Sequence, residues 1–374
     1  MAELWKLIVP PAARARIEEG KAGLLAVIPD GPLSLLPFEA LVVEPGEEPT
    51  YVLDVGPPVL YCHSATLLTT LSRRAEAEPR PGVEPVLSVA DPLWPDPSEP
   101  PVGQVAPSVA SPPVDVVRSA AQRLDRLPNA NQESQWVAET LGDAGLAVEQ
   151  LLREQATENT VRLRVAGRRI VHFACHGLAD ESRPNSAALV LTPAAPPSGL
   201  TTLTQQRFLS LLPDRAAALF GENNYGLPKS LLETLPEPGS DEAKGLPPIR
   251  PEDHDGLLML PEICELNLHG CELAILSACS TNFGLEQSGE GVWALSRGFL
   301  AAGARRVVAT DWVVRDREAA KLVGTLAAVI AEAETAGRTV DLADGLHRAK
   351  LSVRQQQAWS SPHYWAAYVL IGPP

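Results

Sequence analysis

Two short motifs place reactive side chains directly after apolar runs that we expect to form buried strands. His176 follows the run 169–174 and precedes Gly177, and Cys279 follows the run 272–277. In an open parallel sheet, sites form beyond the carboxyl ends of the strands. If the two strands are neighbours, His176 and Cys279 therefore lie across one crevice at that edge.

A cysteine and a histidine placed in this way are suited to acyl transfer. A free thiol has a pKa of about 8.5, and a neighbouring imidazole can take its proton while the sulfur attacks a carbonyl carbon. The backbone N–H groups of Gly177 and Cys279 are the expected oxyanion donors, because glycine lets a substrate approach closely. A cysteine at a strand end is more often a small core residue, however. On these residues alone, both interpretations stay open.

The elements that must position these side chains follow an α/β pattern. Further strands are expected at 24–28, 85–90, 188–191, 306–310 and 364–371, and helices at 64–74, 132–141, 157–165, 258–266, 290–302, 316–333 and 340–356. Strands that alternate with helices predict parallel pairing in an α/β fold.

The chain divides by pattern into two units. Residues 1–152 form a first, N-terminal α/β unit, and residues 153–374 form a more regular unit that carries both motifs. A Pro-rich insertion at about 193–255 interrupts the second unit. A long irregular stretch inside a compact domain is usually functional or disordered, so we expect this insertion to be mobile and protease-sensitive.

Composition excludes several classes of function. The 374 residues carry a net charge of −15, which disfavours direct contact with nucleic acid or with anionic membrane surfaces. No apolar stretch reaches the ~18 residues of a transmembrane helix, and the first residues do not form a signal peptide. Five cysteines without regular spacing indicate free thiols in a reducing, cytoplasmic compartment.

Several segments, spread over nearly the whole chain, resemble the CHAT domain, a caspase-like (clan CD) cysteine protease family. They are 25–41 (LAVIPDGPLSLLPFEAL), 170–177 (IVHFACHG), 186–191 (SAALVL), 276–281 (LSACST), 289–291 (GEG), 295–305 (LSRGFLAAGAR) and 363–372 (HYWAAYVLIG). The resemblance implies a caspase-like three-layer sandwich. Its mostly parallel central sheet would have helices on both faces, after an N-terminal pseudo-caspase-like α/β half.

The same resemblance implies a function. His176 and Cys279 become the catalytic dyad of a cysteine endopeptidase that cleaves a protein substrate and needs no cofactor or metal. The family suggests an effector of bacterial defence or cell death, controlled by a regulatory protein or by a fused sensor or repeat domain. Two alternatives stay open: a catalytically silent caspase-like scaffold for protein binding, and a thioesterase or acyltransferase that uses the same dyad.

The substrate pocket is the least determined part of the site. Ser277 stands two residues before the nucleophile and cannot supply charge, whereas Asp311 follows the strand 306–310 and can bind a basic side chain. A buried carboxylate paired with a cation would favour cleavage after Arg. The equally weighted alternative makes Asp311 a loop cap.

The remaining histidines and cysteines have simpler explanations. His172 lies within an apolar run and is expected to be a packed core residue. Cys175 is expected to pack on the opposite side of the strand end from His176. The spacing of Cys264, His269 and Cys271 lacks a close C-x-x-C pair, which argues against zinc.

Overall fold

The computed structural model describes residues 2–74, 83–93, 124–179, 187–193, 255–282, 284–287 and 291–374. Apart from its two ends, the predicted insertion at 193–255, with its predicted mobility, lies outside the described residues.

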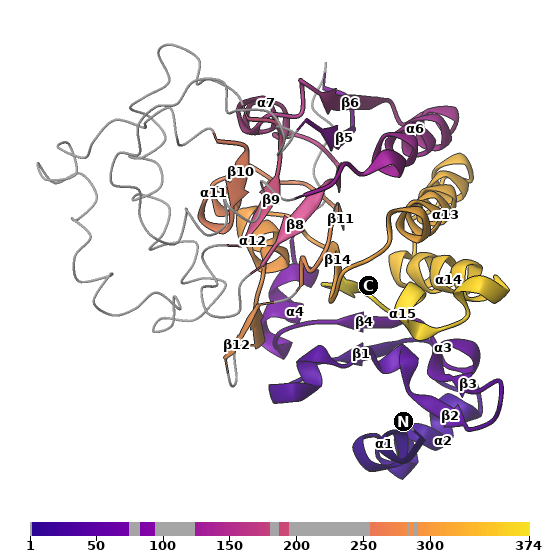
Figure 1. Cartoon of the computed structure of the whole chain (residues 1–374). Helices are drawn as coiled ribbons and strands as arrows, with labels where there is room; N and C mark the ends of the chain where they lie inside the picture. Colours follow the sequence, from indigo (N-terminus) through magenta and orange to yellow (C-terminus); the bar gives the residue numbers. More distant parts are fainter. Residues whose placement is uncertain are drawn as a thin grey trace, which may run out of the picture.

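An eight-stranded sheet forms the centre of the molecule (Figure 1). Its strands, in spatial order, are β1 (Leu25–Val27), β4 (Val59–Tyr61), β15 (Tyr368–Ile371), β14 (Val307–Thr310), β11 (Leu273–Ser277), β7 (Ile170–Ala174), β5 (Val86–Pro92) and β6 (Val148–Arg153). Every pair of neighbours is parallel except β14 and β15. Strands from both predicted units, 1–152 and 153–374, therefore belong to one sheet.

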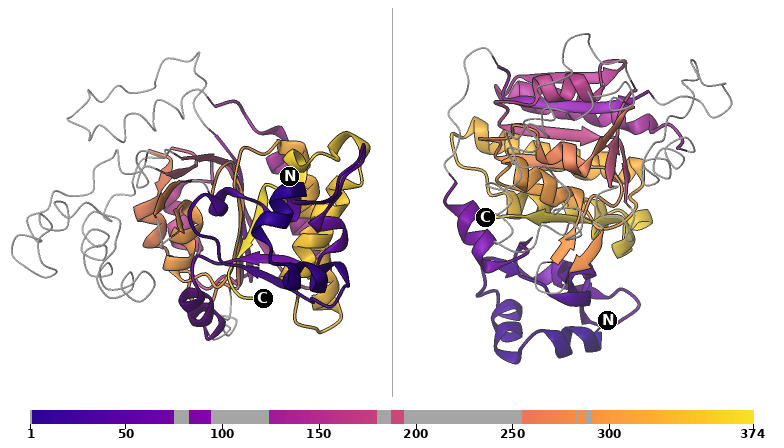
Figure 2. Two further views of the ribbon diagram at one scale, coloured as in Figure 1. Left: turned by 90° about the horizontal axis from the view of Figure 1, so that it is seen from below. Right: turned by 90° about the vertical axis from the view of Figure 1, so that its left-hand side faces the viewer.

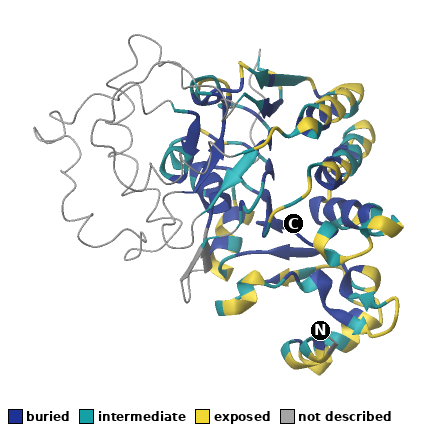
Figure 3. Cartoon of the chain, viewed as in Figure 1, coloured by how far each residue is buried: buried dark blue, intermediate teal, exposed yellow. Residues whose placement is uncertain are grey.

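Helices cover both faces of this sheet, which confirms the predicted three-layer α/β sandwich (Figure 2). Apolar side chains on one face pack with α4 (Ala65–Ser72), α7 (Glu158–Arg164), α11 (Leu260–Cys264) and α12 (Leu295–Ala302). The other face packs with α3 (Val52–Val55), α6 (Pro128–Asp143), α13 (Asp316–Thr335), α14 (Leu342–Arg354) and α15 (Pro362–Trp365). The central strands are buried, and the outer sides of the helices are exposed (Figure 3).

Local sequence explains where several helices begin. The side chain of Thr157 accepts a hydrogen bond from the Thr160 N–H and caps α7. Ser64 and Asp341 cap α4 and α14 in the same way. Each cap satisfies a backbone N–H that would otherwise have no partner in the first turn.

The remaining elements form smaller units. A three-stranded antiparallel sheet contains β8 (His176–Leu178), β9 (Ala188–Val190) and β10 (Leu257–Met259). Two hairpins are formed by β2 (Val42–Glu44) with β3 (Thr50–Tyr51) and by β12 (Leu285–Gln287) with β13 (Gly291–Trp293). Short helices complete the chain: α1 (Ala2–Ile8), α2 (Pro11–Glu18) and the 3-10 helices η1 (Gly31–Leu35), η2 (Phe38–Ala40) and η7 (Gln357–Trp359).

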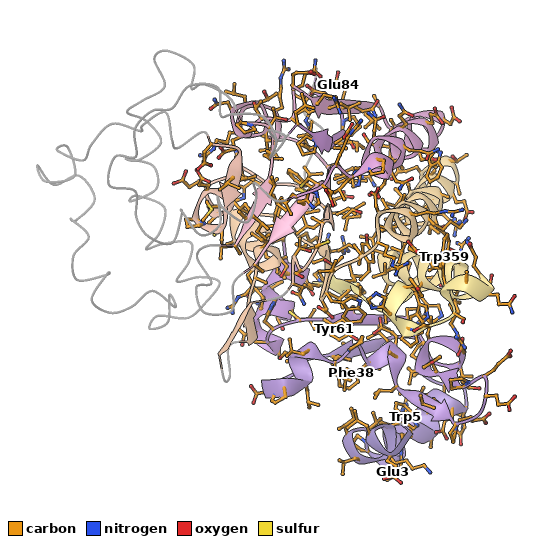
Figure 4. The ribbon with its side chains drawn as sticks, viewed as in Figure 1. Glu3, Trp5, Phe38, Tyr61, Glu84 and Trp359 are labelled. Atoms are coloured by element: carbon orange, nitrogen blue, oxygen red, sulfur yellow. The ribbon has the colours of Figure 1, made fainter. Side chains whose placement is uncertain are left out.

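The N-terminal segment is attached to the main body by buried polar contacts. Lys350 of α14 forms an ion pair with Glu39, and the Tyr61 hydroxyl donates to the other oxygen of that carboxylate. The ring of Phe38 packs edge-on against Tyr61, with 6.4 Å between ring centroids (Figure 4). Because a buried charge needs a partner, the Glu39–Lys350 pair fixes this segment against the second helical layer.

Three predicted elements have wrong boundaries. The predicted helix 290–302 starts only at Leu295, because residues 291–293 form β13. The predicted helix 258–266 contains the end of β10 before α11 begins. The predicted strand 364–371 begins with the last residues of α15 and is extended only from Tyr368. In each case a short apolar run is compatible with both a helix and a strand, and tertiary pairing decides between the two.

Among the residues described, no helix is both long and apolar enough to cross a membrane.

Candidate active site

The two motifs leave the sheet side by side. Strands β7 and β11 are paired in parallel, and their last residues, Ala174 and Ser277, are register partners. His176 and Cys279 therefore follow neighbouring strands at the same edge of the sheet. The sequence places the two residues across one crevice only if their strands are neighbours, and the pairing of β7 with β11 meets that condition.

Gly177 brings the two motifs into direct contact. A β-carbon at this position would lie 2.3 Å from the carbonyl oxygen of Cys279 and 3.4 Å from its amide nitrogen. Only a residue without a side chain leaves room for this approach. Gly177 thus has a steric reason to be glycine, and its predicted role as an oxyanion donor remains a prediction.

The imidazole of His176 is held by a backbone carbonyl. Its Nε2 lies 2.6 Å from the carbonyl oxygen of Asp125. A carbonyl oxygen only accepts hydrogen bonds, so Nε2 must carry a proton. In the neutral ring the lone pair is then on Nδ1, which is the nitrogen available to accept a proton. Sequence reasoning missed Asp125, because a backbone carbonyl has no residue-type signature.

The thiol of Cys279 is partly buried, and its environment favours the protonated form. Burial raises its pKa, a backbone hydrogen bond of Val314 lowers it, and the carboxylate of Asp316 raises it again. The Sγ atom also lies 3.8 Å from the Val314 carbonyl oxygen, to which the thiol donates weakly. Asp316 is itself fixed by Asn129, whose N–H and side-chain amide donate to it at 2.7 and 2.8 Å. At neutral pH, nucleophilic attack by Cys279 therefore needs a base to take its proton.

Hydrogen bonds from β14 fix the turn after Cys279. Ser280 has a φ of 55°, in the left-handed region that costs a non-glycine residue about 1 kcal/mol or more. Hydrogen bonds from Thr310 stabilise this strained turn. The Thr310 hydroxyl donates to the Ala278 carbonyl, and its N–H donates to the Thr281 hydroxyl at 2.9 Å. The Asn282 N–H donates to the Thr310 carbonyl at 2.8 Å. Cys279 is therefore followed by a turn with little freedom to move.

The two predicted pocket residues lie close to this turn, and both are buried. Asp311 accepts a 2.8 Å hydrogen bond from the Asn282 side chain, whose own oxygen accepts from Ser296 at 2.7 Å. Burial raises the pKa of Asp311 to about 7, while Asn282 and Lys350 lower it and Glu39 raises it. The Ser277 hydroxyl lies 3.1 Å from the Tyr368 hydroxyl.

The remaining candidates are core residues. His172 is fully buried, with Nδ1 2.9 Å from the Ser88 hydroxyl and Nε2 2.8 Å from Glu133. Cys175 is buried in the apolar cluster, and burial raises the pKa of its thiol. In the described part of the chain, no group of three or more His, Cys, Asp or Glu side chains is arranged to hold a metal ion.

Comparison with known proteins identifies the family. The model of the CHAT domain matches residues 1–373. The chain belongs to the CHAT domain family. This CHAT domain is also similar to tetratricopeptide repeat protein 28 of Mus musculus and of Homo sapiens, with 27% and 26% identity over 246 residues, or 66% of the chain. It spans only 8% of the length of those relatives.

Solved structures show the fold of this CHAT domain. The Arg-specific cysteine proteinase gingipain R matches all of the chain and 70% of its own, with a TM-score of 0.51 and 11% identity. Yeast separase in complex with securin matches 91% of the chain and 14% of its own, with a TM-score of 0.43. The CHAT domain therefore has the fold of caspase-like cysteine proteases.

Proposed function

We propose that this CHAT domain is a cysteine endopeptidase with His176 as base and Cys279 as nucleophile. The observation that supports the proposal most directly is the contact between the two strand ends. Gly177 lies against the Cys279 backbone, while the Asp125 carbonyl leaves His176 Nδ1 as the proton acceptor. A cysteine whose pKa is raised by burial needs such a base.

The proposed reaction uses these groups in two steps. His176 Nδ1 takes the proton of the Cys279 thiol as the sulfur bonds to the scissile carbonyl carbon. The imidazolium then gives that proton to the departing amine nitrogen, which leaves a thioester. Water adds to the thioester and loses a proton to Nδ1, and the acid product leaves as the thiol is restored. The N–H groups of Gly177 and Cys279 are the proposed donors to the oxyanion in both steps.

The proposed substrate is a protein segment with a basic residue before the cut. Asp311 supports this preference, because its carboxyl lies near the turn that carries Cys279 and its partner Asn282 is neutral. Gingipain R, a fold relative, is described as Arg-specific. Regulation by a repeat domain or partner protein is proposed from the curated relatives, which are tetratricopeptide repeat proteins. A cytoplasmic role in bacterial defence rests on the family resemblance.

Digestion of a peptide library by purified protein tests the proposal. Cys279→Ala and His176→Ala should each abolish cleavage and leave the thermal unfolding transition nearly unchanged. Cys264→Ala, which removes another partly buried thiol, and His363→Ala, which removes an exposed imidazole, should retain cleavage. Asp311→Asn should weaken the preference for Arg by about 10-fold or more.

Each alternative function predicts a different result in this experiment. Cleavage by Cys279→Ala, with the substitution verified by mass spectrometry, would exclude Cys279 as the nucleophile. Labelling of Cys279 by a thiol probe that does not depend on His176, with no cleavage, would favour the silent scaffold. Turnover of thioesters without peptide cleavage would favour the acyltransferase. An unchanged profile in Asp311→Asn would make Asp311 a loop residue only.

A further inference from the structure

A buried carboxylate lies one strand away from the dyad, outside the groups used above. Asp91 is near the end of β5, and the preceding residue, Ala90, is the register partner of Ala174 on β7. Asp91 therefore leaves the sheet at the same edge as His176. Its φ of 47° is in the left-handed region, and such strain in a non-glycine residue persists only where the surroundings enforce it.

Two arginines surround this carboxylate. Arg126 forms a fork on it, with Nε 3.0 Å from Oδ1 and a terminal nitrogen 2.7 Å from Oδ2, and Arg153 lies 3.3 Å from Oδ2. The Asp91 side chain is 1% exposed, whereas the Arg126 side chain is 61% exposed. Burial alone would raise the pKa of Asp91, but the hydrogen bonds and charges of the two arginines outweigh it and hold that pKa below its ordinary value. The carboxylate is therefore ionised at neutral pH.

The fork acts on the group that holds His176. Asp125 and Arg126 share one planar peptide unit, so the position of Arg126 determines where the Asp125 carbonyl oxygen points. A bidentate Arg–carboxylate pair fixes direction as well as distance. We propose that Asp91 is a positioning residue that works through Arg126: it aims the Asp125 carbonyl at His176 and so orients the imidazole of the dyad. This proposal rests on the proposed function of His176.

Two residues that follow Arg126 also hold the segment 125–129 in place. Leu127 packs against Ala90 and Ala174 at the strand ends. Asn129 donates twice to Asp316, the carboxylate that acts on the Cys279 thiol. The segment is thus held on the C-terminal side of the Asp125 carbonyl, and the Asp91 fork is the charged part of that support.

The main test uses Arg126→Gln, because the exposed Arg126 side chain can change without disturbing the core. Loss of the fork should lower kcat/KM about 10- to 100-fold with little change in KM, a partial loss of general base catalysis. Arg126→Lys keeps a charge but not the fork and should recover only part of that loss. Arg354→Gln is the matched control, because it removes another Arg–Asp fork, to Asp54, between α14 and α3.

A second measurement does not depend on proteolysis. The rate of Cys279 alkylation by iodoacetamide is followed against pH in each variant. A base that accepts the thiol proton accelerates this reaction, so displacement of the Asp125 carbonyl in Arg126→Gln and Asp91→Asn should lower the His176-dependent part of the rate. Arg354→Gln should keep the wild-type profile, and thermal unfolding verifies that each variant is folded.

The outcomes separate the two proposals. If His176→Ala leaves the wild-type alkylation profile unchanged, the proposed dyad is wrong and the positioning role falls with it. If His176→Ala changes the profile but Arg126→Gln and Asp91→Asn match wild type in both measurements, the dyad stands and the positioning role is overturned. Full recovery by Arg126→Lys would also overturn it, because charge alone would then suffice.

Discussion

At the scale of single residues, Gly177 lies too close to the backbone of Cys279 to carry a side chain. A methyl group at residue 177 would meet the Cys279 carbonyl oxygen at 2.3 Å, a distance that requires the backbone to move. Gly177→Ala should therefore reduce cleavage about 100-fold or more and lower the melting temperature, because the nucleophile is displaced. Kinetics and thermal unfolding measure the two effects.

Gly142 provides the matched control for this substitution. It lies in α6, and a β-carbon there would meet nothing within 4 Å. Gly142→Ala should keep full activity and stabilise the protein by up to about 1 kcal/mol, as expected in a helix. Wild-type activity in Gly177→Ala would show that the two strand ends are farther apart in solution.

At the scale of elements, the sheet that carries His176 is joined to α7 by a buried acid. Strand β8 pairs with β9 and β9 with β10, and the Gly256 N–H before β10 donates to Glu158 of α7 at 2.9 Å. The pKa of Glu158 is raised to about 9, mainly by burial and also by Glu262 and Asp255, while the Gly256 N–H and Arg162 act to lower it. The carboxyl is therefore mainly protonated at neutral pH.

This acid makes stability depend on pH. The folded pKa lies above the unfolded value of about 4.3, so the contribution of Glu158 is complete below that value. It is lost as the pH rises toward about 9. Glu158→Gln keeps an uncharged side chain at every pH. Its free energy of unfolding should therefore fall less with rising pH than that of wild type, by at least about 1.4 kcal/mol, the equivalent of one pKa unit.

Urea unfolding of wild type and Glu158→Gln at pH values from about 5 to 9 measures the difference. Glu332→Gln, which removes an exposed partner of Arg348, is the control and should follow the wild-type curve. Parallel curves for Glu158→Gln and wild type would mean that Glu158 titrates near its ordinary pKa.

At the scale of the whole molecule, one sheet spans the two units expected from the sequence. Residues 1–152 supply nearly all of β1, β4, β5 and β6, and residues 153–374 supply β7, β11, β14 and β15. A fragment of residues 153–374 would leave β7 and β15 each without one partner, exposing apolar strand edges. Such a fragment should aggregate or unfold without a cooperative transition.

Co-expression with residues 1–152 should restore a soluble complex, as measured by size-exclusion chromatography and circular dichroism. A 153–374 fragment that unfolds cooperatively by itself would contradict this expectation and would favour two independent domains.

The sequence predicts the central strands better than the outer strands and the long-range contacts that hold the site in place. Buried runs such as 273–277 are mostly apolar, so β7 and β11 follow from pattern, whereas their pairing, which brings His176 and Cys279 to one edge, is fixed only in the folded sheet. Strands β4 and β6 were not predicted, since β4 has only three residues and β6 has mixed polarity, and neither run has a clear period. The Asp125 carbonyl and the Asp91–Arg126 fork join residues 51 and 35 positions apart, and nothing local in the sequence encodes such pairings.

The place of β15 has a consequence for how the protein is made. This strand lies between β4 and β14, yet the ribosome synthesises it after every other strand of the sheet. The Asp311 N–H, beside the turn of Cys279, donates to the Ala367 carbonyl just before β15. A nascent chain therefore carries His176 and Cys279 outside the ribosome before the strand that completes the support of the Cys279 turn exists. Synthesis itself delays this arrangement until β15 has been translated.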